Sequence, residues 1–377
     1  MECSIIQILR SIEGSRATFK TLGSVEFRRT QQGKLLYHVG NSAIVFTIKQ
    51  QGEWRAAKCY TSRSERIEVI YGDRLLRDEL YIPIDNEQGV WLDLLITEWI
   101  EGVTLRERIR TLVQRNDSAG LSHLSKSFDA LALELLESDH AHGDITCENI
   151  LIDLQGELHL IDFDNSYTPQ LAGLESLELG TEAYQHPARS ASDFDRTIDD
   201  YSLALISSAL SLIALSPEIF ERHKDREGLL FDPKGVIERR DGPHALALQL
   251  FEKSGSIIEY RIAEMLQSAT PALPHLCQLL HYKHRGVHRN ARPSTIFCRH
   301  GLWGYLNDFS REVIPPIFDA ALAFSEGAAA VRINSTWHYI DSQCRLALNC
   351  QEFEQIQSVE GGKARVKRDG VWMEIEI

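Results

Sequence analysis

The sequence predicts a mixed α+β fold that ends in a β-rich repeat region, and three observations support this prediction. Short apolar runs separated by turns occupy residues 35–97, a pattern typical of strands. Two longer apolar segments, at residues 121–140 and 201–213, have the length of helices. In about the last 78 residues, tryptophan-centred segments recur at gaps of 34 and 35 residues, and a fixed period of this size indicates stacked structural units.

Composition and charge limit the possible functions. The chain has 377 residues, of which 43% are hydrophobic, so it can bury a large core and is expected to form two or three domains. Its net charge of −14 argues against nucleic acid or an anionic membrane as the main partner, because a phosphate-binding face is usually basic. The seven cysteines are scattered and include no Cys-x-x-Cys pair, so we expect reduced thiols in a cytoplasm rather than disulfides or a zinc site.

The elements are predicted in order from their apolar patterns. A short amphipathic helix comes first, at residues 5–12, and a helix at residues 64–70, with Ser64 as its N-cap, follows the third strand. Strands are expected at residues 35–37, 43–48, 54–59, 80–83 and 91–97, a hairpin at residues 150–161, and helices from residue 104, at 121–140 and at 201–213. The last helix is shorter than a bilayer span, so we expect a buried core helix and no membrane partner.

The segment at residues 142–164 carries a carboxylate, an amide and a second carboxylate in a fixed order. Asn149 follows Asp144 by five residues, and the predicted hairpin separates Asn149 from Asp162. We therefore expect the hairpin to bring Asp162 beside the loop that holds Asp144. This set suits phosphoryl transfer, in which one carboxylate orients the attacking hydroxyl and accepts its proton. An amide oxygen and a second carboxylate then hold Mg²⁺ on the nucleotide phosphates.

On these residues the chain resembles the protein-kinase superfamily. Asp144-x-x-x-x-Asn149 matches the catalytic-loop Asp and Asn of that family, and Asp162-Phe163-Asp164 matches its Asp-Phe-Gly motif. The resemblance implies that Asp144 is the catalytic base and that Asn149 and Asp162 are the Mg²⁺ ligands.

The chain also departs from the family pattern at three positions. Gly143 stands where the family has an Arg, Thr146 where it has a Lys, and Asp164 where it has a Gly. The resemblance accounts for His142 as a packing residue beneath the Phe of the second motif. A zinc site that uses His140 and His142 with neighbouring acids is a minor alternative.

The resemblance further implies an ATP site in the predicted strands. Lys58, in Ala56-Ala57-Lys58, matches the lysine that contacts the α- and β-phosphates, and it needs a carboxylate partner from the following helix. Glu65 and Glu68 share one face of that helix, and Glu65 is narrowly favoured as the partner. The other residues expected to bind ATP are Gly40 in a reduced glycine-rich loop, Val45 over the adenine, Ala56, and the backbone of Glu98 and Ile100 in a hinge.

Residues 179–188 indicate the class of substrate. Gly180-Thr181-x-x-Tyr184 resembles the end of the activation segment of protein kinases, which small-molecule phosphotransferases of the aminoglycoside type usually lack. The resemblance therefore favours a Ser or Thr hydroxyl of a protein as the acceptor. Asp199, at the start of the helix at 201–213, is expected to anchor the catalytic loop through backbone N–H groups or to cap the helix.

The C-terminal region resembles WG repeats, which are small β-rich units. Trp303, Trp337 and Trp372 mark successive units, and the edge strands of such an array favour protein binding. The predicted domains are an N-terminal helical segment at residues 1–29, a bilobal protein-kinase-like domain at residues 30–298, and WG-like β repeats at residues 299–377.

Together these resemblances imply a bacterial eukaryotic-like Ser/Thr protein kinase of the cytoplasm. It would use ATP and Mg²⁺, phosphorylate a protein substrate, and bind a protein partner through its repeats. Two alternatives stay open. One is a pseudokinase that binds nucleotide as a scaffold, which the reduced glycine loop and Thr146 favour, and the other is a small-molecule phosphotransferase.

Overall fold

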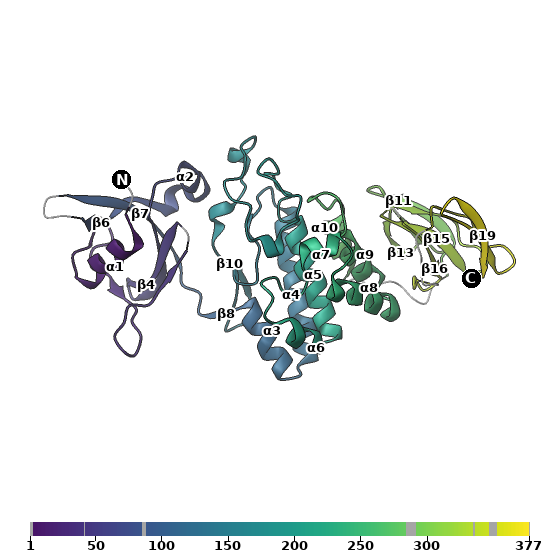
Figure 1. The fold of residues 1–377 in the computed structure, drawn as a ribbon, viewed down its shortest axis with the longest axis horizontal. Coiled ribbons are helices and arrows are strands. Elements are labelled where there is room, and N and C mark those ends of the chain that lie inside the picture. The colour runs from purple at the N-terminus through teal and green to yellow at the C-terminus, as the bar shows by residue number, and fades with distance from the viewer. Residues whose placement is uncertain are drawn as a thin grey trace.

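The computed structural model describes residues 3–40, 42–84, 88–283, 292–334, 336–346 and 353–376. Figure 1 shows three parts in a row, namely an N-terminal sheet with two helices, a central helical part, and a C-terminal region of strands. The chain is therefore mixed α and β with a β-rich C-terminal region, as the sequence predicts. Among the described residues, no helix is long and apolar enough to cross a membrane.

The N-terminal part is one antiparallel sheet in the strand order β1-β6-β7-β5-β4-β2, with β3 paired to β4. Its elements are α1 (Ile5–Glu13), β1 (Thr18–Phe19), β2 (Glu26–Phe27), β3 (Tyr37–Val39), β4 (Ala43–Gln50), β5 (Glu53–Tyr60), α2 (Glu65–Tyr71), β6 (Leu75–Pro83) and β7 (Gly89–Glu98). Strands β3 to β7 confirm the predicted strands to within a few residues. Strands β1 and β2 hold two residues each, too few to produce a recognisable pattern.

Side chains alternate along β4 and β5, so the sheet has two different faces. On one face, Ile44 and Phe46 are buried in a cluster that α1 completes with Ile8. The other face carries Val45 and Lys58, which lie opposite each other on neighbouring strands, and neither is fully buried. Helix α1 thus covers one face of the sheet and leaves the other to the candidate site.

We predict that the apolar face of α1 stabilises the sheet. Ile8 is fully buried, so Ile8→Ala should lower the free energy of unfolding by about 2–5 kcal/mol, through lost burial and the cavity left behind. Ile6, on the same helix, is 61% exposed, and Ile6→Ala should change that free energy by about 0.5 kcal/mol. Urea unfolding measures both, and equal losses would show that α1 does not pack on the sheet as described.

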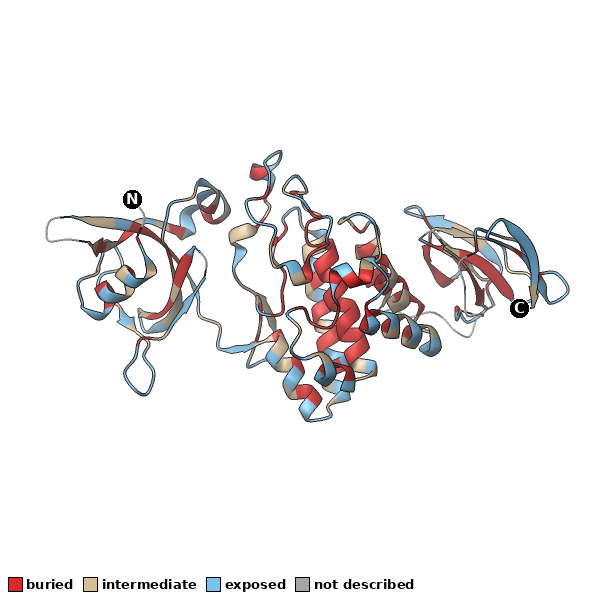
Figure 2. Cartoon of the chain, in the orientation of Figure 1, coloured by how far each residue is buried: buried red, intermediate tan, exposed pale blue. Residues whose placement is uncertain are grey.

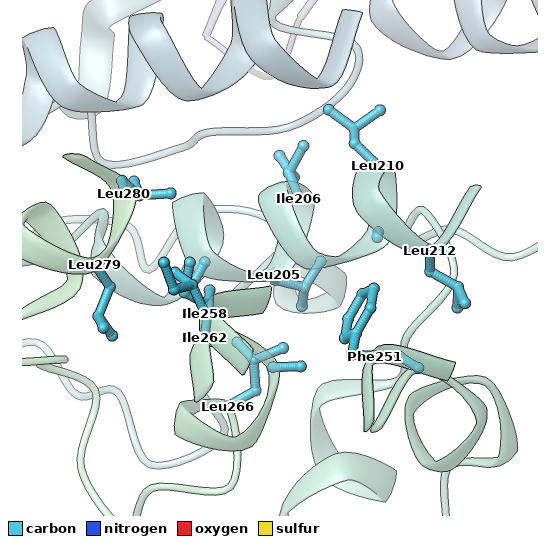
Figure 3. Close-up of a cluster of buried hydrophobic side chains, with 14 of the residues drawn as sticks. Leu205, Ile206, Leu210, Leu212, Phe251, Ile258, Ile262, Leu266, Leu279 and Leu280 are labelled. Atoms are coloured by element: carbon cyan, nitrogen blue, oxygen red, sulfur yellow. The ribbon is translucent and has the colours of Figure 1, made fainter. Parts of the chain in front are cut away.

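The central part is built around one buried helix. Its elements are β8 (Gly102–Thr104), α3 (Leu105–Gln114), α4 (Ser118–Glu137), β9 (Ile150–Asp153), β10 (Leu158–Leu160), α5 (Asp200–Leu215), α6 (Glu218–His223), α7 (Pro233–Ile237), α8 (Gly242–Ser254), α9 (Ile257–Met265) and α10 (Leu276–Lys283). Helix α5 is buried from Asp200 to Ile213, which confirms the predicted core helix (Figure 2). Figure 3 shows Leu205 of α5 near Phe251 of α8 and Ile262 of α9.

The described residues of the C-terminal region form three antiparallel sheets of three strands each, which confirms the predicted repetition. They are formed by β11 (Thr295–Arg299), β12 (Leu302–Leu306) and β13 (Glu312–Phe318); β14 (Ala320–Ala321), β15 (Ala328–Ile333) and β16 (Thr336–Asp341); and β17 (Gln355–Ile356), β18 (Lys363–Arg368) and β19 (Val371–Glu376). The same type of hydrogen bond, from a tyrosine hydroxyl to a backbone carbonyl, joins successive sheets. The Tyr305 hydroxyl donates to the Leu322 carbonyl at 2.8 Å, and the Tyr339 hydroxyl donates to the Gln357 carbonyl at 2.7 Å.

The second of these sheets is fixed to helix α9. The buried Arg261 guanidinium donates two hydrogen bonds to the Asp319 carboxylate, at 2.6 and 3.0 Å. Beside this pair, His338 packs edge-on against Tyr260, with ring centroids 6.0 Å apart. His338 is buried, and neither of its ring nitrogens has a hydrogen-bond partner among the residues that the structure describes. Burial, and then the charge of Arg261, lowers the pKa of His338 to about 4.

We predict that His338 makes the structure sensitive to acid. Since its pKa is depressed in the folded state, the unfolded chain binds an extra proton between pH 6.5 and pH 4, and stability falls as the pH falls through that window. His338→Leu should be close to neutral at pH 7 and should remove about 2 kcal/mol of the loss on going from pH 7 to pH 5. Urea unfolding followed by tryptophan fluorescence measures the difference, and parallel pH profiles for the two proteins would refute it.

Candidate active site

The loop between α4 and β9 is held in place by hydrogen bonds to one buried carboxylate. Asp199, immediately before α5, accepts hydrogen bonds from the backbone N–H groups of His142 and Gly143. Its side chain makes no capping bond to α5, so the predicted N–H contacts are confirmed and a capping contact is not observed. Burial raises the pKa of Asp199, while the charge of His142 and the two N–H donors oppose that shift.

Asp144 is oriented by two neighbours. Its Oδ1 accepts the backbone N–H of Thr181 at 2.7 Å, and its Oδ2 accepts the side-chain amide of Asn149 at 3.1 Å. The same amide donates to the Asp144 carbonyl at 2.9 Å. Because Asn149 uses its nitrogen for these bonds, its Oδ1 is the atom able to coordinate a metal.

The hairpin of β9 and β10 leads directly to Asp162. The backbone N–H of Ile161 donates to the Asn149 carbonyl at 3.0 Å, which ties the end of the hairpin to the loop. Asp162 has a left-handed backbone, with φ of 67°, and this conformation redirects the chain after the strand. His142 donates from Nε2 to the Ile161 carbonyl at 2.9 Å and packs on Phe163, so its ring is engaged in packing as expected.

Lys58 joins the N-terminal sheet to the segment after β10. Its Nζ lies 2.5 Å from Asp162 and 2.8 Å from Asp164. The hydroxyls of Tyr60 and Tyr71 also donate to Asp164, at 2.9 and 2.8 Å. Burial lowers the pKa of Lys58, but the two carboxylates raise it by more, so the amine stays charged.

The carboxylate partner of Lys58 differs from the predicted one. Glu65 is exposed in the first turn of α2, and Glu68 pairs with Arg77. The buried side of α2 carries Ile67 and Tyr71, so both glutamates lie on its outer face. Tyr71 instead reaches Asp164, the carboxylate that replaces a glycine of the expected motif.

The residues predicted to bind ATP lie on or next to the sheet. Val45 faces Lys58 across the β4–β5 pair, and Ala56 is two residues before Lys58 on the same face. Glu98 is exposed at the end of β7, and Ile100 is half-buried in the link to β8. Gly40 donates its N–H to the Ala43 carbonyl in the turn before β4, while Asn41 of this loop lies outside the described residues.

A polar pocket of about 460 Å³ lies beside Asp144 and is lined in part by Asn149 and Thr181. Arg106 of α3, which sequence reasoning missed, forms part of its wall. Its guanidinium binds Glu148 at 2.5 Å and the Tyr184 hydroxyl at 2.8 Å. These contacts join segments far apart in sequence, so no local pattern reveals them.

Arg189 is a second residue that sequence reasoning missed. It is buried, and its Nη1 donates to the Gly143 carbonyl at 3.3 Å. Burial lowers its pKa, and the charges of Asp199 and Asp144 oppose that shift. The Arg189 guanidinium therefore places a positive charge next to the loop, although Gly143 stands where the kinase pattern has an arginine.

Comparison with known proteins identifies one unit of the C-terminal region. A family model described as a WG containing repeat matches residues 303–337, so this region contains a WG repeat. The match runs from β12 to the start of β16. No protein-kinase family model matches the chain, and no curated protein matches it.

We predict that Asp199 holds the loop in place. Asp199→Ala would leave two buried N–H groups without an acceptor and should lower the free energy of unfolding by about 2–4 kcal/mol. Asp139→Ala, at an exposed acid of the same loop, should have little effect. Chemical denaturation compares the two variants, and an unchanged Asp199→Ala protein would contradict the anchoring role.

Proposed function

We propose that this chain is an ATP-dependent Ser/Thr protein kinase whose bilobal kinase-like domain comprises the N-terminal sheet and the central helical part. Its bounds differ from the expected residues 30–298, because β1 and β2 pair within the N-terminal sheet and β11 pairs with β12 of the repeat region. The observation that carries the proposal is the 2.5 Å ion pair between Lys58, on a strand of the N-terminal sheet, and Asp162, after β10. The loop that the β9–β10 hairpin joins to Asp162 holds Asp144 bonded to Asn149. Protein kinases use such a set of one amine, two carboxylates and one amide to transfer a phosphoryl group from ATP.

The donor atoms suit Mg²⁺. Asp162 offers a carboxylate and Asn149 an amide oxygen, and Mg²⁺ prefers such hard oxygen ligands. Lys58 faces two carboxylates, those of Asp162 and Asp164, so the group retains one negative charge that a cation can balance. When bound, Mg²⁺ neutralises charge on the β- and γ-phosphates.

Asp144 is the proposed base. With one oxygen held by Thr181 and the other by Asn149, its carboxylate is fixed before an acceptor arrives. The Ser or Thr side chain of a protein substrate would enter the neighbouring polar pocket and give its proton to Asp144. Lys58 would turn from its carboxylates toward the α- and β-phosphates.

A nucleotide-binding scaffold is the second candidate, and one observation favours it. Lys58 is already held by both Asp162 and Asp164, so it has to give up at least one of them to meet a phosphate. A small-molecule phosphotransferase has less support. The backbone of Thr181 is bonded to Asp144, as expected for a segment that docks a peptide.

We also propose a cytoplasmic location and a protein partner for the chain. The described cysteines are free thiols, which agrees with a reducing cytoplasm. Strand β19 exposes Val371, Trp372 and Met373, and an apolar edge strand of this kind suits binding of a protein partner through the repeats.

We predict that the purified chain transfers label from γ-labelled ATP in the presence of Mg²⁺ to itself or to a generic basic protein. Asp144→Asn should lower the rate by about 10²–10⁴-fold through loss of the base, and Asp162→Ala should abolish transfer through loss of the metal ligand. Phosphoamino-acid analysis then identifies Ser or Thr.

Asp139→Asn is the matched control, because this acid lies in the same loop and is exposed. It should leave transfer unchanged. Binding of ATP and Mg²⁺ by thermal shift, with no transfer to a panel of substrates, would favour the scaffold. Absence of nucleotide binding in the wild-type chain would overturn both candidates.

A further inference from the structure

Three metal-ligating side chains meet where helices α4 and α10 pack together. Glu137 is the last residue of α4, and Cys277 and His281 lie four residues apart on α10. Their ligand atoms all lie within 4.8 Å of one another, and this is the one such group within the described residues. Residues four apart share a helix face, so α10 presents both of its ligands to the end of α4.

We propose that Glu137, Cys277 and His281 form a site for one Zn²⁺ ion. Thiolate and imidazole are ligands that zinc prefers over magnesium or calcium, and a carboxylate oxygen is a common third ligand. Thiolate and carboxylate together balance the charge of a divalent cation. The side chains of Glu137 and His281 are 56% and 43% exposed, so water can complete a tetrahedral shell.

The two helices hold these ligands in a fixed relation. Leu276, Leu279 and Leu280 anchor α10 in the hydrophobic core, where Figure 3 shows Leu279 and Leu280. A second contact fixes the register of the pair, because the buried Lys283 Nζ lies 2.7 Å from Asp129 of α4. The helices are thus positioned by packing and by an ion pair that the proposed ion does not use.

The His281 imidazole is already directed at the proposed ion. Its Nε2 lies 2.7 Å from the Glu137 carboxylate. Zinc would replace the proton between these two groups and recruit the Cys277 sulfur. The ion would then cross-link α10 to the end of α4, seven residues before Asp144, and stabilise the start of the loop that carries the proposed base.

The site is tested with Co²⁺ as a spectroscopic substitute for zinc, on the full chain in a buffer with excess Mg²⁺ that occupies hard oxygen sites. We expect one equivalent to give the visible absorption of tetrahedral Co²⁺ and a thiolate charge-transfer band, and one equivalent of Zn²⁺ to abolish both. Zinc should also raise the thermal midpoint of the wild-type chain.

Cys277→Ser should abolish the charge-transfer band, and His281→Ala should weaken Co²⁺ binding at least tenfold. The matched control is Cys298→Ser, at an exposed thiol on β11, which should leave both bands intact. A thermal midpoint equal to that of the metal-free wild type shows that each variant is folded. The proposal is overturned if stoichiometric Co²⁺ gives no thiolate band, or if the band survives in folded Cys277→Ser protein.

Discussion

The buried carboxylate of Asp199 connects the hydrophobic core to the loop that carries the candidate chemistry. Helix α5 is buried almost throughout, so its position is set by packing on every side. Asp199 transmits that position to His142 and Gly143 through two backbone N–H bonds. The next residue, Asp200, accepts the N–H of Leu273, and burial raises its pKa to about 7. The residues at the N-terminal end of one apolar helix, Asp199 and Asp200, thus order two segments that have no regular structure of their own.

Ion pairs between Lys58 and two carboxylates hold the N-terminal sheet against the segment after β10. Lys58 is largely buried, and a buried amine is retained only where anions compensate its desolvation. Asp162 and Asp164 provide that compensation, and the hydroxyls of Tyr60 and Tyr71 satisfy the second oxygen of Asp164. The glycine that the kinase pattern would place at Asp164 could not take part in this network. Asp164, which stands where the kinase pattern has a glycine, is therefore a carboxylate partner of Lys58, and Lys58 does not need Glu65 as its partner.

The sequence allowed prediction of features that depend on local pattern. The hairpin at residues 150–161, the buried helix α5 and the repetition around Trp303 all follow from periodicity, and each is present. The partner of Lys58 was not predictable, because it depends on which face of the seven-residue helix α2 is turned toward the sheet. The contacts of Arg106 and Arg189, and the grouping of Glu137 with Cys277, join segments separated by 40 to 140 residues, where spacing carries no information.

The repeat region shows the same dependence on a few polar contacts between apolar layers. Tyr305 and Tyr339 occupy equivalent places after their tryptophans, and each hydroxyl reaches the backbone of the following sheet. In the third unit, Glu374 stands at the equivalent place, two residues after Trp372. A carboxylate cannot donate a hydrogen bond to a carbonyl, so Glu374 cannot form the bond that Tyr305 and Tyr339 form. Its outer strand β19 instead exposes apolar side chains and, among the described strands, pairs with β18 alone. The proposed protein partner would add a strand at this edge.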